Sequence, residues 1–133
     1  KTSISPGQIP ILTREFAGKE RLLIWGWQKR LRKLRSLGRV AIWGAGAKGV
    51  TFANLLDPQC RLIDCAVDLN PDKQGGFFPG TGHPIVSCFE LPRRNVANAI
   101  LMNPNYREEN QALLKKAGIS VNLIDRKDYE NKY

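Results

Sequence analysis

A glycine-rich turn has the residue types and spacing best suited to binding a phosphate or a sugar. Residues 44–49 read Gly-Ala-Gly-Ala-Lys-Gly, after the apolar run Val40–Trp43 and before a stretch with helical composition. In such a turn Gly44 permits a tight bend, and Gly46 lets a ligand approach the backbone closely. Gly49 lets the helix pack near the strand, and the amides at the helix start point at an anion. The pattern predicts a Rossmann-like nucleotide site without choosing the nucleotide.

An acidic residue follows the next apolar run. Asp68 lies 19 residues after Gly49 and directly follows Leu62–Val67, which we expect to be the second strand. In Rossmann-like sites an acidic side chain about 20 residues beyond the glycines binds the ribose hydroxyls. Asp68 could instead serve only as a cap for the next turn, but its spacing from the glycines favours ribose binding.

Cationic and amide side chains near these two features extend the candidate site. Lys48 lies inside the glycine turn, where a cation at a helix start faces an unfavourable dipole unless an anion compensates it. We therefore expect Lys48 to pair with a phosphate or a sugar oxygen. Asn70 and Lys73 follow Asp68 in a segment that is either a plain turn or a contact for a nucleobase or diphosphate.

A third group of polar residues stands where a later strand gives way to a helix. It consists of Asn103, Asn105 and Tyr106, and Asn105 could act only as the helix cap. Ligands of parallel sheets bind at the carboxyl ends of the strands, so all these loops should meet at one edge. The predicted binding residues are Gly44, Gly46, Lys48, Gly49, Asp68, Asn70, Lys73, Asn103, Asn105 and Tyr106.

No set of residues forms a convincing catalytic group. His83 is the only histidine, and no carboxylate partner can be named for it from the sequence. Cys88 lies close to His83 but lacks an orienting third residue, and Ser87 lacks a nucleophile-elbow context. The three cysteines form no paired motif, which makes a metal site improbable and favours reduced thiols in a cytoplasmic protein. The sequence indicates a binding module more clearly than an enzyme.

Strands that alternate with helices predict an α/β fold with a Rossmann-like parallel sheet flanked by helices. Before the first strand, Leu23, Trp27, Leu31 and Leu34 form an apolar stripe and predict a basic amphipathic helix over residues 18–37. We expect residues 1–17 to be a linker or arm, 18–126 the Rossmann-like domain, and 127–133 a polar tail. The absence of an initiating Met suggests a fragment of a longer protein.

The net charge of +9 raises the question of a nucleic-acid partner, since much of the basic excess lies between Lys19 and Arg39. Charge runs on helices are more often solvated surface, and no RNA-binding aromatic motif or helix-turn-helix pattern is present. We therefore consider a nucleic-acid partner unlikely. No apolar run approaches the roughly 20 residues of a membrane span, so no membrane partner is expected either.

Four motifs in order give the chain a resemblance to a known module. These are Trp43–Gly49, Asp68–Gly75, Pro79–Thr81 and Met102–Tyr106. Between residues 19 and 124 the chain resembles the C-terminal domain of the sugar C-methyltransferase family, which acts on nucleotide-linked deoxysugars using S-adenosylmethionine (SAM). Related Rossmann-like modules accompany other sugar-modifying enzymes, which leaves the subfamily open.

The resemblance implies a parent protein with a zinc-binding N-terminal domain, a central methyltransferase domain, and this C-terminal domain. The SAM site and the catalytic base would belong to the central domain, and this domain would help to hold the nucleotide-sugar substrate. On that interpretation the chain is not catalytic alone. Lys48, Asn70, Lys73, Asn103 and Tyr106 would then face the substrate cleft.

Three other interpretations stay open. The first alternative is an NAD(P)-binding domain of an oxidoreductase, which the glycines and Asp68 suit, although no hydride-transfer residue is apparent. A second is a methyltransferase domain that binds SAM here, but Trp43 stands where such sites usually have an acidic residue. A third is a nucleic-acid adaptor built on the basic helix, which predicts binding that weakens steeply with salt.

Overall fold

The computed structural model describes residues 11–126, and the side chains of residues 11–17 and 19 lie outside the description. The expected tail at 127–133 and most of the expected arm at 1–17 therefore fall outside the described residues. Three helices, five strands and two short 3₁₀ turns make up the described part. In chain order they are α1 (Ile11–Arg35), β1 (Arg39–Trp43), α2 (Ala47–Leu56), β2 (Cys65–Val67), β3 (Ile85–Val86), η2 (Cys88–Glu90), β4 (Val96–Leu101), η3 (Pro104–Tyr106), α3 (Arg107–Ala117) and β5 (Asn122–Asp125).

The five strands form one sheet in the order β3-β2-β1-β4-β5, and every neighbouring pair is parallel. This is the strand order of the Rossmann fold, with its reversal between β1 and β4. Trp43 at the end of β1 is level with Val67 of β2 and Leu101 of β4. The predicted parallel α/β fold is confirmed, and the three strand ends meet at one edge of the sheet.

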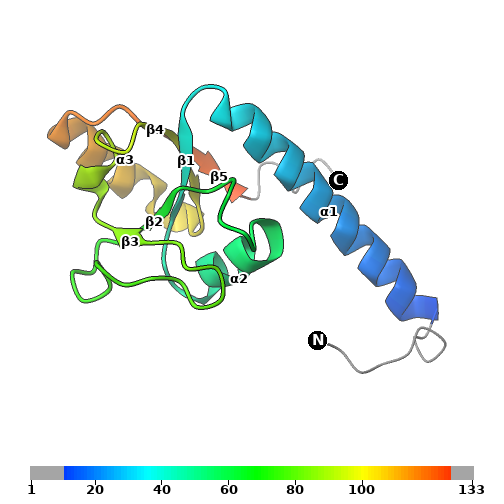
Figure 1. Ribbon diagram of the computed structural model, residues 1–133. Coiled ribbons are helices and arrows are strands. Elements are labelled where there is room, and N and C mark those ends of the chain that lie inside the picture. Colours follow the sequence, from blue (N-terminus) through cyan, green and yellow to red (C-terminus); the bar gives the residue numbers. More distant parts are fainter. Residues whose placement is uncertain (1–10, 127–133) are drawn as a thin grey trace.

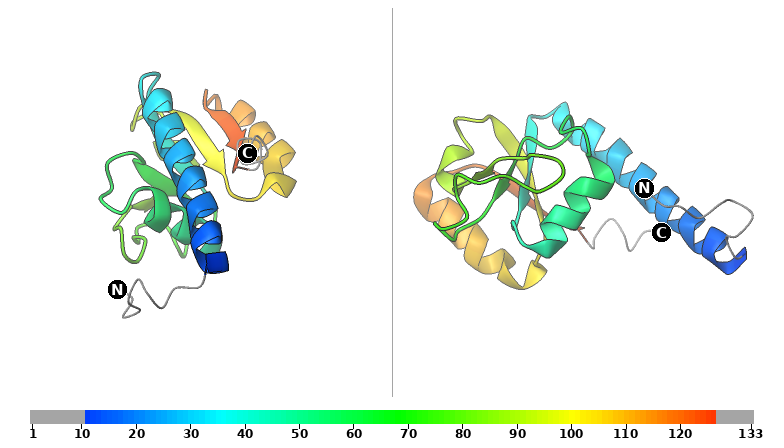
Figure 2. Two further views of the ribbon diagram at one scale, coloured as in Figure 1. Left: turned by 90° about the vertical axis from the view of Figure 1, so that its right-hand side faces the viewer. Right: turned by 60° about the horizontal axis from the view of Figure 1, so that its bottom comes forward.

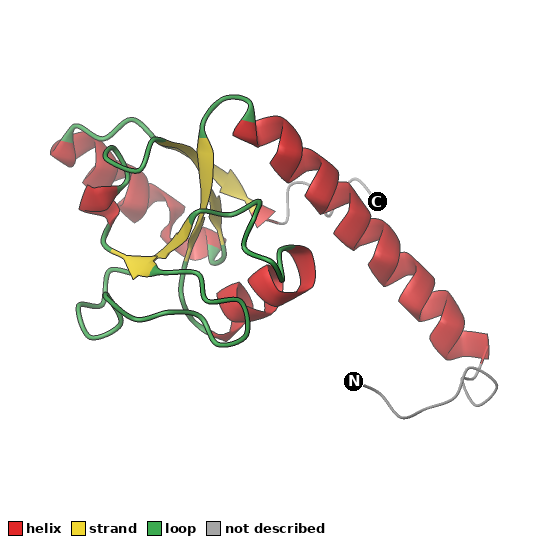
Figure 3. Ribbon diagram, in the orientation of Figure 1, coloured by secondary structure: helices red, strands yellow, loops and turns green. Residues whose placement is uncertain are grey.

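Helices cover both faces of the sheet (Figures 1 and 3). On one face, Trp27 and Leu31 of α1 and Phe52 of α2 pack in a cluster with Val40 and Ile42 of β1. Trp27 and Phe52 meet edge to face with their ring centroids 5.3 Å apart. The opposite face holds a second cluster in which α3 packs on the sheet. Figure 2 shows these layers from two further sides.

The apolar stripe of α1 lies where the sequence predicts it. Trp27 and Leu31 are buried, Leu23 and Leu34 are half-buried, and Arg32 and Arg35 are exposed. The helix begins at Ile11 rather than at Gly18, so its predicted start is wrong. A single helical glycine costs only about 1 kcal/mol relative to alanine, and Gly18 does not interrupt this helix. In Figure 1 the first part of α1 extends beyond the sheet.

The second strand is shorter than predicted. The sequence places it at Leu62–Val67, whereas β2 contains only Cys65–Val67. The reason is Asp57, whose carboxylate accepts the backbone N–H groups of residues 61–63 at 2.7–3.0 Å. Those amides are therefore committed to a side chain and cannot join a ladder.

Candidate functional site

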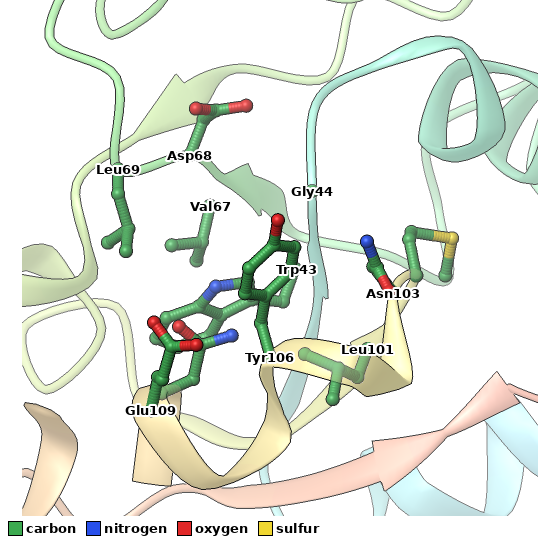
Figure 4. Close-up of a pocket in the computed structure, with 11 residues that line it drawn as sticks. Trp43, Gly44, Val67, Asp68, Leu69, Leu101, Asn103, Tyr106 and Glu109 are labelled. Atoms are coloured by element: carbon green, nitrogen blue, oxygen red, sulfur yellow. The ribbon is translucent and has the colours of Figure 1, made fainter. Parts of the chain in front are cut away.

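A cleft of about 410 Å³ lies at the carboxyl ends of β1, β2 and β4, where the strand order reverses (Figure 4). Its volume is within the range of small-ligand sites. Eleven residues line it: Trp43, Gly44, Val67, Asp68, Leu69, Leu101, Met102, Asn103, Tyr106, Glu109 and Asn110. The position agrees with the rule that open parallel sheets bind ligands outside their strand ends.

The cleft combines an aromatic and apolar floor with a polar rim. Trp43 is almost fully buried, whereas the ring of Tyr106 is 52% exposed. Figure 4 shows the Tyr106 ring lying over the cleft beside Trp43, with the Glu109 carboxylate close by. Leu69 is also exposed at the cleft. An accessible aromatic ring next to apolar side chains suits a flat ring in the ligand.

Asp68 is held between the glycine turn and the loop after β2. One carboxylate oxygen, Oδ2, accepts the backbone N–H of Ala45 at 3.1 Å, and Oδ1 accepts that of Asn70 at 2.9 Å. The Gln74 side chain donates to the Asp68 backbone carbonyl at 2.8 Å. Each carboxylate oxygen has room to accept a second hydrogen bond, so a fixed Asp68 can still receive a hydroxyl donor.

The glycines of the turn are constrained in different ways. Gly44 has φ +126°, a region that favours glycine, and a Cβ there would crowd the Met102 side chain at 3.2 Å. At Gly49 a Cβ would overlap the carbonyl oxygen of Gly44, so close packing of helix and strand explains this glycine as predicted. A Cβ at Gly46 would meet no described atom within 4 Å, and its φ is −81°. Neither packing nor backbone conformation requires glycine at position 46.

The start of α2 offers donors to an anion. Gly46 is its N-cap and supplies no side-chain cap, and the first turn contains no acidic residue. Lys48 in that turn is exposed. Backbone N–H groups and a positive dipole end beside a cation make this helix start suitable for a phosphate group.

The structure brings four of the predicted binding residues together in the cleft: Gly44, Asp68, Asn103 and Tyr106. Gly46, Lys48 and Gly49 lie on the adjoining turn and helix and do not line it. Asn70 and Lys73 are exposed in the loop after β2, outside the lining residues.

The capping role suggested for Asn105 belongs to Asn103. The Asn103 side chain accepts the backbone N–H of Asn105 at 3.1 Å and caps η3, whereas α3 begins after Tyr106. Asn105 is exposed and does not line the cleft.

Sequence reasoning did not identify Trp43, Glu109 or Asn110 as parts of the cleft. Glu109 and Asn110 follow Tyr106 by three and four residues at the start of α3, so they share its side of the helix. That spacing was the available signal for them. For Trp43, the signal is its position as the last residue of β1, directly before Gly44.

His83 has a carboxylate partner after all, which corrects the sequence analysis. Its Nε2 lies 2.9 Å from Asp57 Oδ2, and its Nδ1 lies 2.6 Å from the Thr81 hydroxyl. The imidazole is fully buried and does not line the cleft. His83 therefore joins the loop before β3 to the end of α2, in a structural role.

The cysteines are poor nucleophiles in this environment. Burial raises the pKa of Cys65 to about 12, and burial also raises the pKa of Cys88. Partial burial and the nearby carboxylates of Asp57 and Asp64 raise the pKa of Cys60. The thiols are thus protonated at neutral pH. Within residues 11–126, no cluster of three metal-ligating side chains occurs.

A family model described as "C-methyltransferase C-terminal domain" matches residues 8–124. No curated protein matches the chain. This match gives no support to the oxidoreductase alternative. None of the helices in the described part is long and apolar enough to cross a membrane.

Proposed function

This chain belongs to the C-methyltransferase C-terminal domain family, and from that premise we propose that it holds the nucleotide-sugar substrate of a SAM-dependent sugar C-methyltransferase in the cytoplasm. The methyl transfer itself is assigned to a central domain of the same parent protein, which supplies the SAM site and the catalytic base. The observation that carries the proposal is that an aromatic cleft and an anion-attracting helix start adjoin each other at the end of β1.

The nucleoside half of the substrate occupies the cleft. The exposed ring of Tyr106 offers a stacking surface for a base, and Glu109 and Asn110 offer hydrogen-bonding groups beside it. Asp68, which two backbone N–H groups hold in place, accepts a hydrogen bond from the sugar attached to that base. The cleft of about 410 Å³ is sized for a nucleoside.

The diphosphate lies against the start of α2. Gly46 lets the phosphate oxygens come close to the backbone, and Lys48 neutralises part of their charge. The sugar then extends from the second phosphate, and we assign its contacts to Asn70, Lys73 and Asn103. We assign no ligand contact to Asn105, since its backbone N–H donates to the Asn103 side chain and it does not line the cleft.

SAM does not fit this site. The start of α2 and the exposed Lys48 both place positive charge beside the glycine turn, which would oppose the cationic sulfonium of SAM there. Trp43 rather than an acidic residue precedes the glycine turn. These features support a SAM site in another part of the parent protein.

Calorimetric titration tests the proposal. The chain is titrated in turn with a thymidine-diphosphate sugar, SAM and NADH, and only the nucleotide-sugar is expected to bind. Tyr106→Ala removes the stacking ring and should weaken binding about tenfold, because base–aromatic stacking contributes about 1–3 kcal/mol. Lys48→Gln removes a charge-assisted contact and should weaken it by a similar factor.

The matched control is Lys115→Gln, an exposed lysine in the last turn of α3, which should leave the affinity unchanged. Tight binding of NADH or SAM by the wild type would contradict the proposal. So would nucleotide-sugar binding that neither Tyr106→Ala nor Lys48→Gln weakens.

A further inference from the structure

A second hollow lies at the other end of the sheet from the cleft. It has a volume of about 250 Å³ and is lined by Arg35, Arg39, Cys60, Arg61, Leu62, Ile63 and Asp64. Arg39 and Trp43 stand at opposite ends of β1, so the two sites are about 13 Å apart at about 3.3 Å per residue. A ligand in this hollow is therefore separate from a ligand in the cleft.

Three arginines from three segments of the chain line this hollow. Arg35 ends α1, Arg39 begins β1, and Arg61 lies in the turn after α2. Arginine stays charged at every physiological pH, and its planar fork of N–H groups matches the oxygens of a phosphate. The hollow thus gathers the donors that a phosphoryl group requires.

Asp64, the carboxylate that lines the hollow, compensates only part of the positive charge of the three arginines. Asp64 Oδ2 lies 3.2 Å from Arg94, and its Oδ1 lies 3.4 Å from Arg39, whose side chain is 58% exposed. Among the described side chains, no carboxylate pairs with Arg35 or Arg61. A long, exposed ion pair contributes little, so Arg39 can turn to an incoming anion at small cost.

The other walls of the hollow do not repel an anion. The backbone N–H groups of Arg61, Leu62 and Ile63 are already bound to Asp57, so the donors come from the arginine side chains. Cys60 contributes a protonated thiol, because burial and two nearby carboxylates raise its pKa. The hollow therefore combines three cations with one carboxylate, which Arg39 shares with Arg94 outside the hollow.

We propose that the hollow among Arg35, Arg39 and Arg61 binds a phosphoryl group, carried either by inorganic phosphate or by a phosphorylated small molecule. Its volume holds a phosphate with a small organic group attached, and it is smaller than the cleft. Three arginines and one carboxylate line this depression, and such an excess of positive charge concentrates anions and favours a dianion over chloride.

An NMR titration of the ¹⁵N-labelled chain tests this site. Inorganic phosphate and glucose 1-phosphate are added in separate experiments, with sodium chloride at equal ionic strength as the reference. We expect saturable shifts of the amides of residues 61–64 and of Arg39 with both phosphate probes. Tighter binding of glucose 1-phosphate would identify the carrier as a phosphorylated small molecule, and equal affinity would identify the ion itself.

The double variant Arg39→Gln, Arg61→Gln should bind phosphate at least about tenfold more weakly, since two charge-assisted contacts are lost. Arg93→Gln is the matched control, because Arg93 pairs with Glu90 outside the hollow and its loss should change nothing. If the double variant unfolds, Arg61→Gln alone gives the same test, because no described hydrogen bond or ion pair involves its side chain.

Three results would overturn the site: the same shifts with chloride, full affinity in the double variant, or shifts confined to the start of α2 that Lys48→Gln abolishes. The last of these would place phosphate at the proposed diphosphate site instead. Because the two sites respond to different variants, either proposal can fail without the other.

Discussion

Gly46 and Gly49 lie three residues apart in one turn, yet the structure needs a glycine at only one of them. A methyl group at Gly49 would overlap the Gly44 carbonyl oxygen, which belongs to the backbone and cannot move aside easily. At Gly46 a methyl group would point into open space. Packing therefore accounts for Gly49, whereas ligand approach is the reason that we propose for Gly46.

Two alanine variants separate these explanations. Gly49→Ala should lower the free energy of unfolding by about 2–3 kcal/mol, as overpacking does in tightly packed sites. Gly46→Ala is its matched control and should lower it by less than about 1 kcal/mol, since alanine is only a poorer N-cap. Urea denaturation followed by tryptophan fluorescence gives both values. Equal losses in the two variants would contradict the packing argument.

His83 shows why some residue roles could not be predicted. Its partner Asp57 lies 26 residues away in the chain, and only the folded structure brings the two together. The place of Asp68 in the cleft was predictable because the residue follows a strand at a fixed distance from the glycines, whereas ribose binding by Asp68 stays a prediction. A residue whose function follows a local pattern is readable from sequence, and one whose partner comes from tertiary packing is not.

At the scale of elements, the sequence predicts best where apolar runs and glycines coincide. β1 contains the whole apolar run Val40–Trp43, and α3 ends at Ala117, where Gly118 adopts the left-handed conformation of a C-cap. The predicted start of β2 is wrong because the backbone N–H groups of residues 61–63, just before the strand, donate to the Asp57 carboxylate. The strand ends that form the cleft were predicted, but Glu109 and Asn110 were not.

The turn between α2 and β2 depends on Asp57. Its carboxylate accepts three backbone N–H groups, of residues 61–63, and also contacts His83 Nε2. Asp57→Ala would leave these groups without their partner, and a buried unsatisfied group costs about 1–3 kcal/mol. We expect a loss of at least about 3 kcal/mol in the free energy of unfolding, measured by urea denaturation.

Asp64→Ala is the matched control for that variant. Asp64 pairs with Arg39 and Arg94 at a more exposed position, so its loss should cost under about 1 kcal/mol. An Asp57→Ala protein as stable as Asp64→Ala would show that water replaces the carboxylate and that the turn does not depend on it.

At the scale of the whole molecule, strand order decides where the chemistry can occur. The alternation of strands and helices predicts a parallel sheet, but many orders of five strands are compatible with it. The observed order puts β1 between β2 and β4, which brings Asp68 and Asn103 to either side of Gly44. The other end of the same strand carries Arg39 and the second hollow. One central strand thus separates the two proposed anion sites.

Because Cys65 is buried, the free energy of unfolding of the whole domain should decrease as the pH rises through the alkaline range. Burial and the nearby Asp64 raise its pKa from an ordinary value of 9.0 to about 12, so above pH 9 the unfolded chain loses a proton that the folded chain keeps. Stability is therefore intact below pH 9 and falls toward pH 12, by at most about 1.4 kcal/mol per pH unit. Urea denaturation of the wild type and of Cys65→Ala across this range isolates the effect, since both share all other titrations. A difference between them that stays constant with pH would contradict it.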